Sequence, residues 1–135
     1  MVDIRDAVPL RRCRVVRATG EIDVFTAAEF AALLNAPSPR PGPSLLVVDL
    51  RAVLFMDSSG VHELCAAQAR CLGQGGWTRL VYSQRSIHVL LKVMRLGGRF
   101  PRYATTLDAR MGHPRPVGDG PWPRVLPALR PPCSR

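Results

Sequence analysis

The sequence predicts an α/β protein built around a mixed or mostly parallel sheet of about four to five strands, with about three to four helices. Apolar, β-branched runs alternate along the chain with segments whose apolar residues recur at helical spacing. The run 45–50 is apolar on both faces until Asp49, which is typical of a central, covered strand. The 135 residues, 47% of them hydrophobic, fit one domain with a modest two-layer core. The crossovers between parallel strands are expected to be right-handed.

The first part of the chain predicts two strands. Apolar residues within 1–10 indicate a short edge strand. Residues 13–19 are richer in β-branched side chains and predict a second strand. The segment 20–23, which contains a glycine and two acids, is expected to turn the chain.

A helix is expected from about residue 27 to residue 34 or 35. Thr26 and Glu29 match a capping box, in which Thr26 accepts a hydrogen bond from the Glu29 amide and the Glu29 side chain reaches back. Phe25 and Phe30 have the spacing of a hydrophobic staple. The proline-rich segment 37–43 ends this helix and forms a stiff, exposed loop.

A second helix is expected after residues 57–60. Its apolar positions recur at helical spacing, and a glycine-rich segment, 73–76, stops it. The apolar positions are Val61, Leu64, Cys65 and Leu72.

The last part of the folded chain predicts a strand over 78–82 and a third helix that begins at Ser86. In that helix, four apolar residues occupy positions i, i+3, i+4 and i+7. These residues are Ile87, Leu90, Leu91 and Met94. The third helix is closed by glycines at 97 and 98, and it is followed by a short edge strand over 100–103 and one or two helical turns over 105–111.

Charge and composition limit the classes of partner that the chain is expected to bind. The formal net charge is +9, carried almost entirely by arginine, with Lys92 as the single lysine. The arginines are scattered and form no basic helix face, so direct nucleic-acid binding is disfavoured. From about His113 onward the chain is rich in proline and arginine and lacks periodicity, which predicts a tail without a fixed fold.

Four cysteines, at positions 13, 65, 71 and 133, have neither C-x-x-C spacing nor an accompanying histidine cluster, so no metal site is expected. Cys65 and Cys71 fall on a predicted helix, where cysteine often packs as a small apolar residue. We expect no cofactor. No signal-peptide pattern and no apolar run near the roughly 20 residues of a membrane span are present. A cytoplasmic location away from the membrane is therefore expected.

The functional candidates follow the central strand. Asp57, Ser58 and Ser59 are residue types that satisfy unpaired amides at a helix N-terminus, so they can be helix caps and nothing more. The alternative is that one hydroxyl is a phosphorylation site. A phosphoryl group there would meet free amides and a favourable helix dipole. Its added charge would instead disrupt a partner packed over the same spot.

Three blocks of sequence together resemble the STAS domain, and specifically the anti-sigma factor antagonists. The first is the early turn at 19–23, and the second is Val-Asp-Leu at 48–50 followed by Phe-Met-Asp-Ser-Ser-Gly at 55–60. The third is Arg-Leu-Gly-Gly-Arg-Phe at 95–100, with 103–105 after it. The resemblance covers roughly residues 10–112, in the expected order and spacing. It implies a STAS domain with helices packed mainly on one face of the sheet, which we place over 1–112. Residues 113–135 are the tail predicted from composition, which the minimal family lacks.

The resemblance also implies a partner-switching cycle. The unphosphorylated antagonist binds an anti-sigma factor, which is a serine kinase of the histidine-kinase-like ATPase type, and a sigma factor is released. The kinase phosphorylates the first serine after the aspartate, which maps onto Ser58 and switches binding off. A metal-dependent serine phosphatase reverses the modification. The free protein is expected to be a monomer.

A partner-binding surface is expected around this serine, formed by Asp23, Asp57, Ser58, Ser59, Gly60 and His62. Asp23 matches a family acid on the kinase-binding face, although an acid before Thr26 can equally be a turn or cap residue. Ser59 is expected to act as a helix cap. His62 departs from the family pattern and either tunes partner choice or simply faces water.

Other functions are weighed against this one. A STAS scaffold could dock in a stress-sensing or signalling complex without controlling a sigma factor. An enzyme is disfavoured, because His62, His88 and His113 are far apart in sequence, and neither a phosphate loop nor a Ser/His/Asp spacing is found.

Overall fold

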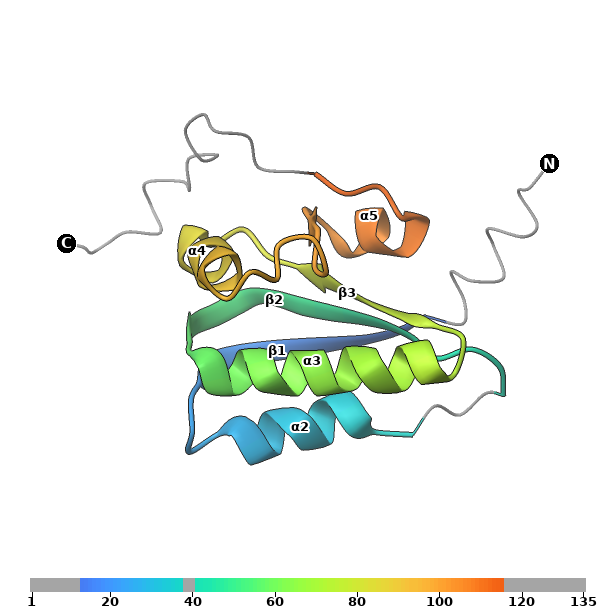
Figure 1. Cartoon of the computed structure of the whole chain (residues 1–135), viewed down its shortest axis with the longest axis horizontal. Helices are drawn as coiled ribbons and strands as arrows, with labels where there is room; N and C mark the ends of the chain where they lie inside the picture. Colours follow the sequence, from blue (N-terminus) through green and yellow to red (C-terminus); the bar gives the residue numbers. More distant parts are fainter. Residues whose placement is uncertain (1–12, 38–40, 116–135) are drawn as a thin grey trace.

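The computed structural model describes residues 13–37 and 41–115 (Figure 1). Strands and helices alternate along these residues, as the hydrophobic pattern predicts. In order, the elements are β1 (Arg14–Ile22), α2 (Ala27–Asn35), β2 (Leu45–Met56), α3 (Ser58–Gly73), β3 (Trp77–Val81), α4 (Arg85–Val93), β4 (Arg102–Tyr103) and α5 (Thr106–Met111).

The strands form one sheet in the order β1-β2-β3-β4, and the three strand pairs in the described residues are all parallel. Parallel neighbours need a crossover, and α2, α3 and α4 supply one between each successive pair of strands. The predicted α/β class is confirmed. The predicted edge strand within 1–10 lies outside the described residues.

Helices α2 and α3 lie side by side along one face of the sheet, and α5 lies on the other side (Figure 1). The larger core joins the sheet to α2, α3 and α4, through side chains such as Phe30, Leu64 and Ile87. A smaller core on the opposite face joins Val47 and Val81 to α5. The helices therefore pack mainly on one face, as expected.

Strand β2 is the centre of the sheet and is covered on both faces. Leu46 and Val48 point into the larger core and Val47 points into the smaller one, which confirms the prediction of a central strand. The strand runs to Met56, beyond the predicted end at residue 50. Exposed Arg51 and Ala52 interrupt its apolar run and hide this continuation in the sequence. Two register shifts against β1 accommodate the extra residues of β2.

Two packing predictions are wrong. Phe25 is 89% exposed and cannot form a staple with the buried Phe30. In α3, Leu72 is exposed and Cys71 is buried in its place. Both residues lie at or just beyond a helix end, where a difference of one residue along the chain changes the face on which a side chain lies. The apolar stripe of α4 is confirmed, because Ile87 and Leu91 belong to the core.

The predicted boundary near residue 112 stays a prediction. Ordered contacts continue to Arg115, whose backbone N–H donates to the carbonyl of Arg102 at 2.8 Å. The predicted tail lies outside the described residues from 116 onward. Within the described ranges, none of the helices combines the length and the apolar character needed to span a bilayer.

Candidate functional site

The candidate site lies where β1 and β2 end at the same edge of the sheet. Ile22 pairs with Met56, the last residue of each strand, and the amide of Asp57 donates to the carbonyl of Ile22 at 3.1 Å. The turn after β1 and the turn after β2 are therefore held together. We call the surface formed by residues 21–26 and 54–63 the Ser58 edge.

Ser58 is the first residue of α3 and is exposed. The side chain of Asp57 is the N-cap, because its Oδ1 accepts a hydrogen bond from the Ser59 amide at 2.8 Å. Among the described residues, the hydroxyls of Ser58 and Ser59 have no hydrogen-bond partner. The expectation that Ser59 caps the helix is therefore wrong, and the Ser58 hydroxyl is open to a docking protein.

The amides at the start of α3 are largely occupied. Besides the Ser59 amide, the amides of Gly60 and Val61 donate to the carbonyl of Asp57, at 3.1 and 3.4 Å. The expectation that a phosphoryl group on Ser58 meets free amides is wrong for these three groups. Such a group would also lie beside the Asp57 carboxylate, which already uses the positive end of the helix dipole.

Asp23 organises the turn before α2. Its Oδ1 accepts hydrogen bonds from the amides of Phe25 and Thr26, at 2.9 and 3.1 Å. The Thr26 hydroxyl accepts from the Asp23 amide at 2.9 Å and donates to the carbonyl of Glu21, also at 2.9 Å. Thr26 makes no side-chain cap, so the predicted capping box with Glu29 is wrong. Asp23 acts here as a turn residue, and its predicted role on the kinase-binding face stays a prediction.

Gly60 is buried where α3 meets the ends of β1 and β2. A Cβ added at this position would lie 2.7 Å from Cγ2 of Ile22 and 2.7 Å from Cγ of Met56. The absence of a side chain lets the start of α3 approach the sheet closely. The structure gives Gly60 this packing role, and its predicted contact with a partner stays a prediction.

His62 is exposed and lies one helical turn after Ser58, at i+4. This spacing places both side chains on the same face of α3. A protein that docks over Ser58 would therefore also meet His62. Both interpretations of His62, partner choice and contact with water, remain compatible with this position.

Sequence reasoning missed an exposed apolar rim beside Ser58. Phe25 and Leu54 are 89% and 82% exposed, and Val24 and Phe55 are also largely exposed. We call these four residues the apolar rim. The run 53–56 was the feature of the sequence that could have predicted this rim, because four consecutive apolar residues of one strand cannot all face the same core. Exposed apolar side chains gathered at one edge are typical of a protein-binding surface.

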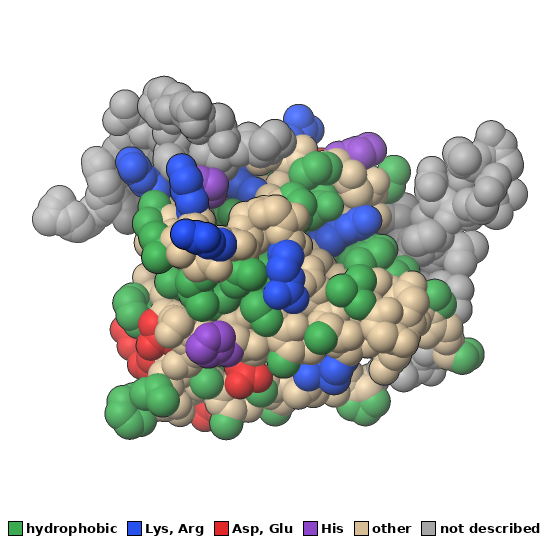
Figure 2. Space-filling model, viewed as in Figure 1, with side chains coloured by type: hydrophobic (Ala, Val, Ile, Leu, Met, Phe, Trp, Pro, Cys, Tyr) green, Lys and Arg blue, Asp and Glu red, His purple; other side chains and the backbone are tan. Residues whose placement is uncertain are grey.

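The Ser58 edge is also acidic. Figure 2 shows acidic side chains gathered at the left end of this face, where Figure 1 places the start of α2 and α3, whereas basic side chains are spread over the rest. Five of the seven acidic residues in the described ranges lie on or next to this edge. They are Glu21, Asp23, Glu29, Asp57 and Glu63.

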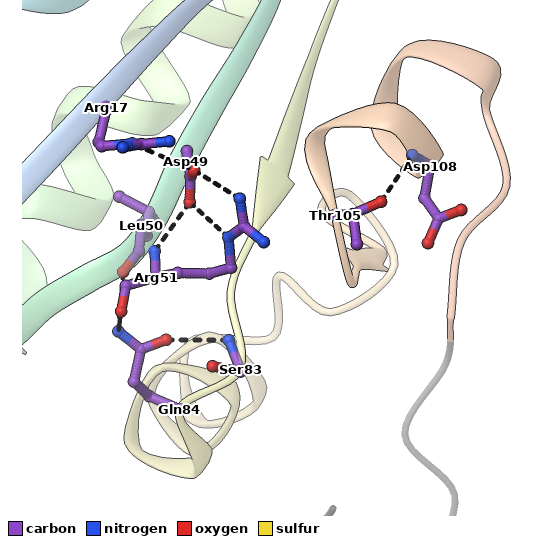
Figure 3. Close-up of polar contacts among 8 residues, drawn as sticks. All are labelled: Arg17, Asp49, Leu50, Arg51, Ser83, Gln84, Thr105 and Asp108. Carbon is purple, nitrogen blue, oxygen red and sulfur yellow. Dashed lines mark hydrogen bonds and ion pairs between the residues drawn. The ribbon is translucent and has the colours of Figure 1, made fainter. Parts of the chain in front are cut away.

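Polar contacts brace the far part of β2 (Figure 3). The Gln84 amide donates to the carbonyls of Leu50 and Val53, both at 2.7 Å, and so satisfies backbone groups that β3 does not reach. The Asp49 carboxylate, 2% exposed, accepts hydrogen bonds from the backbone amide and side chain of Arg51. Burial would raise the pKa of Asp49, but the hydrogen bonds from Arg51, together with the charges of Arg51 and Arg17, lower it overall.

Within the described ranges, no group of three or more histidine, cysteine, aspartate or glutamate side chains could hold a metal ion. The candidate site consists of the exposed Ser58 hydroxyl, the neighbouring Asp57 carboxylate that caps α3, the apolar rim and the acidic side chains around them.

A family model for the STAS domain matches residues 5–109. An anti-sigma factor antagonist from Mycobacterium paratuberculosis is 30% identical, with a TM-score of 0.65 over 75% of this chain and 85% of that one. The anti-sigma factor antagonist SpoIIAA in its unphosphorylated form is 19% identical, with a TM-score of 0.58 over 76% and 90% of the two chains. A sulfate transporter family protein from Wolinella succinogenes is 15% identical, with a TM-score of 0.60 over 75% and 83%.

The last two likenesses concern the fold alone. A comparison with curated proteins finds no match.

Proposed function

This chain belongs to the STAS domain family, and from that membership we propose that it is an anti-sigma factor antagonist controlled by phosphorylation of Ser58. The observation that carries the proposal is the exposed, unbonded Ser58 hydroxyl at the start of α3, beside an exposed apolar rim. The likeness to the Mycobacterium paratuberculosis antagonist supports the choice of partner class.

The unphosphorylated protein binds its anti-sigma factor through the Ser58 edge. Docking covers the apolar rim, led by Phe25 and Leu54, and removes its apolar surface from water. The same contact removes water from Ser58. A sigma factor is released when the anti-sigma factor is engaged in this way.

Phosphorylation reverses the preference. A phosphoserine carries about −1.5 to −2 charges, and a docked partner would have to desolvate this group next to the Asp57 carboxylate. Because the Ser59, Gly60 and Val61 amides are already bonded, this part of α3 offers little compensation. The phosphorylated form therefore releases the partner.

The partners have defined chemical roles in this proposal. The anti-sigma factor is also a serine kinase of the histidine-kinase-like ATPase type, and a serine phosphatase removes the phosphoryl group. The chain itself supplies the acceptor hydroxyl and the docking surface, and it catalyses no reaction.

The phosphorylation step is tested by incubating the full chain with ATP and the kinase recovered from its own cells, and by locating the phosphate by mass spectrometry. We expect one phosphate on Ser58 in the wild type and none in Ser58→Ala. The matched control is Ser59→Ala, which should be phosphorylated as the wild type is. Equal incorporation in Ser58→Ala would remove Ser58 from the mechanism.

The switch is tested by measuring affinity for the same partner with Ser58→Asp and Ser59→Asp. We expect Ser58→Asp to bind at least about tenfold more weakly, which corresponds to about 1.4 kcal/mol. Ser59→Asp, on the less exposed neighbour, should bind more nearly as the wild type does. A Ser58→Asp protein that holds its partner with unchanged affinity would contradict the proposed switch.

One observation favours a second candidate, a STAS scaffold that docks in a signalling complex without a phosphorylation cycle. Asp57 already occupies the helix-terminal amide that would otherwise help to hold a phosphate. Co-purification that recovers sensor proteins, with no anti-sigma kinase and no phosphate on Ser58, would favour this scaffold.

A further inference from the structure

A cavity of about 320 Å³ lies away from the Ser58 edge, between α4 and the segment that leads into β4. Its lining contains none of the residues of the Ser58 edge. The volume falls at the lower end of the range for small-molecule sites. This cavity is therefore independent of the proposed partner switch.

The floor of the cavity is apolar and rigid. Tyr82, Leu91 and Phe100 line it, and each of these side chains is at most 2% exposed. Leu91 and Phe100 also belong to the larger core, so the floor is part of the packed interior. Such a floor is suited to an aromatic ring or a short aliphatic chain.

The rim of the cavity is cationic. Lys92 and Arg102 line it together with His88, and no acidic residue is among the lining residues in the described part of the chain. The Arg102 side chain also donates hydrogen bonds to the carbonyls of Tyr82 and Arg115, at 2.8 and 3.2 Å. Burial lowers the pKa of His88, and the positive charges of Lys92, Arg102 and Arg85 lower it further. The cationic groups therefore act on one small region, which favours a bound anion.

Tyr82 adds an unused polar group. Its side chain is 2% exposed, and its hydroxyl has no hydrogen-bond partner among the described residues. Burial raises the pKa of Tyr82, and the nearby Arg102 opposes that rise. The hydroxyl oxygen is not among the fully buried polar atoms that lack a partner in the described residues, so water or a ligand in the cavity can reach it.

We propose that this cavity binds a small organic anion, in which a carboxylate or phosphate group is attached to one ring or a short chain. The anionic group lies between Lys92 and Arg102 and accepts a hydrogen bond from the Tyr82 hydroxyl. The apolar part packs on Leu91 and Phe100. The volume suits such a ligand, because a cavity of about 150 Å³ is enough for benzene alone.

The first test titrates the full chain with phenyl phosphate, inorganic phosphate and benzyl alcohol, and follows binding by calorimetry and by the His88 ring signals in NMR spectra. We expect phenyl phosphate to bind at least about tenfold more tightly than either fragment. Its phosphate group contacts the cationic rim while its ring packs on the apolar floor. Equal affinity for phenyl phosphate and benzyl alcohol would overturn the proposed anion site.

The second test uses variants. Lys92→Ala should weaken phenyl phosphate binding about tenfold, since a charge-assisted hydrogen bond is lost. Arg70→Ala removes the same charge from the far end of α3 and should bind as the wild type does. Equal losses in the two variants would show that only net charge matters, and would overturn the site.

Tyr82→Phe separates binding from folding. Because the hydroxyl has no hydrogen-bond partner among residues 13–37 and 41–115, its removal should leave the melting temperature unchanged or slightly higher. Affinity for phenyl phosphate should still fall about fivefold. Unchanged affinity would remove Tyr82 from the site.

The bound anion should also raise the pKa of His88, because it opposes the surrounding charges of Lys92, Arg102 and Arg85. His62 and His113 do not line the cavity and serve as internal controls. A His88 pKa that does not change on saturation with phenyl phosphate would place the anion elsewhere and overturn the proposal.

Discussion

At the scale of single residues, Asp57 decides much of what Ser58 can do. The carboxylate caps α3 by accepting a hydrogen bond from the Ser59 amide, so neither serine hydroxyl is needed as the helix cap. The sequence pattern correctly indicated that an acid and two serines begin a helix. It could not say which of the three is the cap, because all three residue types compete for the same amides.

For Asp49 too, the sequence pattern could not determine the role of the side chain, which is a buried charge. Its pattern in the sequence is an acid that ends an apolar run, which is equally compatible with an exposed turn. In the fold it lies on the α5 side of the sheet, where Arg51 and Arg17 approach it. Its position is set by neighbours on two strands.

The network predicts how stability depends on pH. The pKa of Asp49 is lowered in the folded protein, so its contribution to stability is complete above the ordinary aspartate pKa of about 3.9 and is lost as the pH falls through the folded value. We expect Asp49→Asn to lower the free energy of unfolding by about 1–3 kcal/mol at pH 7 and to flatten its dependence on acidic pH. Urea unfolding at several pH values measures both.

The control is Asp108→Asn, whose ion pair with the exposed Arg115 spans 3.4 Å. This variant should lose less than about 1 kcal/mol. If Asp49→Asn were no less stable than Asp108→Asn at pH 7, the buried network would not have the assigned role.

At the scale of elements, α3 depends on close approach to the sheet. Its start packs on the last residues of β1 and β2, and Gly60 occupies the point of contact. The helical period of α3 and α4 was readable from sequence because it depends on residues within one or two turns. The true end of β2 was not, because its register shifts depend on pairing with β1.

Gly60→Ala should destabilise the protein by about 1–3 kcal/mol, because the added methyl group would overlap Ile22 and Met56. Chemical denaturation provides the measurement. The matched control is Gly73→Ala at the other end of α3, where an added Cβ meets nothing within 4 Å. That variant should be as stable as the wild type or gain up to about 1 kcal/mol. Equal stability of the two variants would mean that α3 does not need this contact.

At the scale of the whole molecule, charge and apolar surface are unevenly distributed. The chain has a net charge of +9, yet the Ser58 edge is acidic and carries an apolar rim (Figure 2). The anion-binding cavity lies away from this edge and has a cationic rim. One small domain therefore presents two surfaces of opposite charge, suited to different ligands.

The apolar rim yields a prediction about docking. Phe25→Ser and Leu54→Ser should each lower the affinity for the partner recovered by co-purification at least about tenfold, because central apolar contacts dominate interface energy. Their free energies of unfolding should stay within about 0.5 kcal/mol of the wild type, since both side chains are exposed.

Leu72→Ser is the control, because Leu72 is also exposed but lies at the far end of α3. It should retain full affinity. Unchanged affinity in the two rim variants would place the docking surface elsewhere on the molecule.

The alternation of strands and helices, the central position of β2 and the serine at the start of α3 all followed from the amino-acid pattern. Each depends on residues close together in the chain, so periodicity and residue type are enough to predict it. The exposed rim and the cationic cavity required the folded structure. Each of them joins segments that are distant in sequence, and only packing against the sheet brings those segments together.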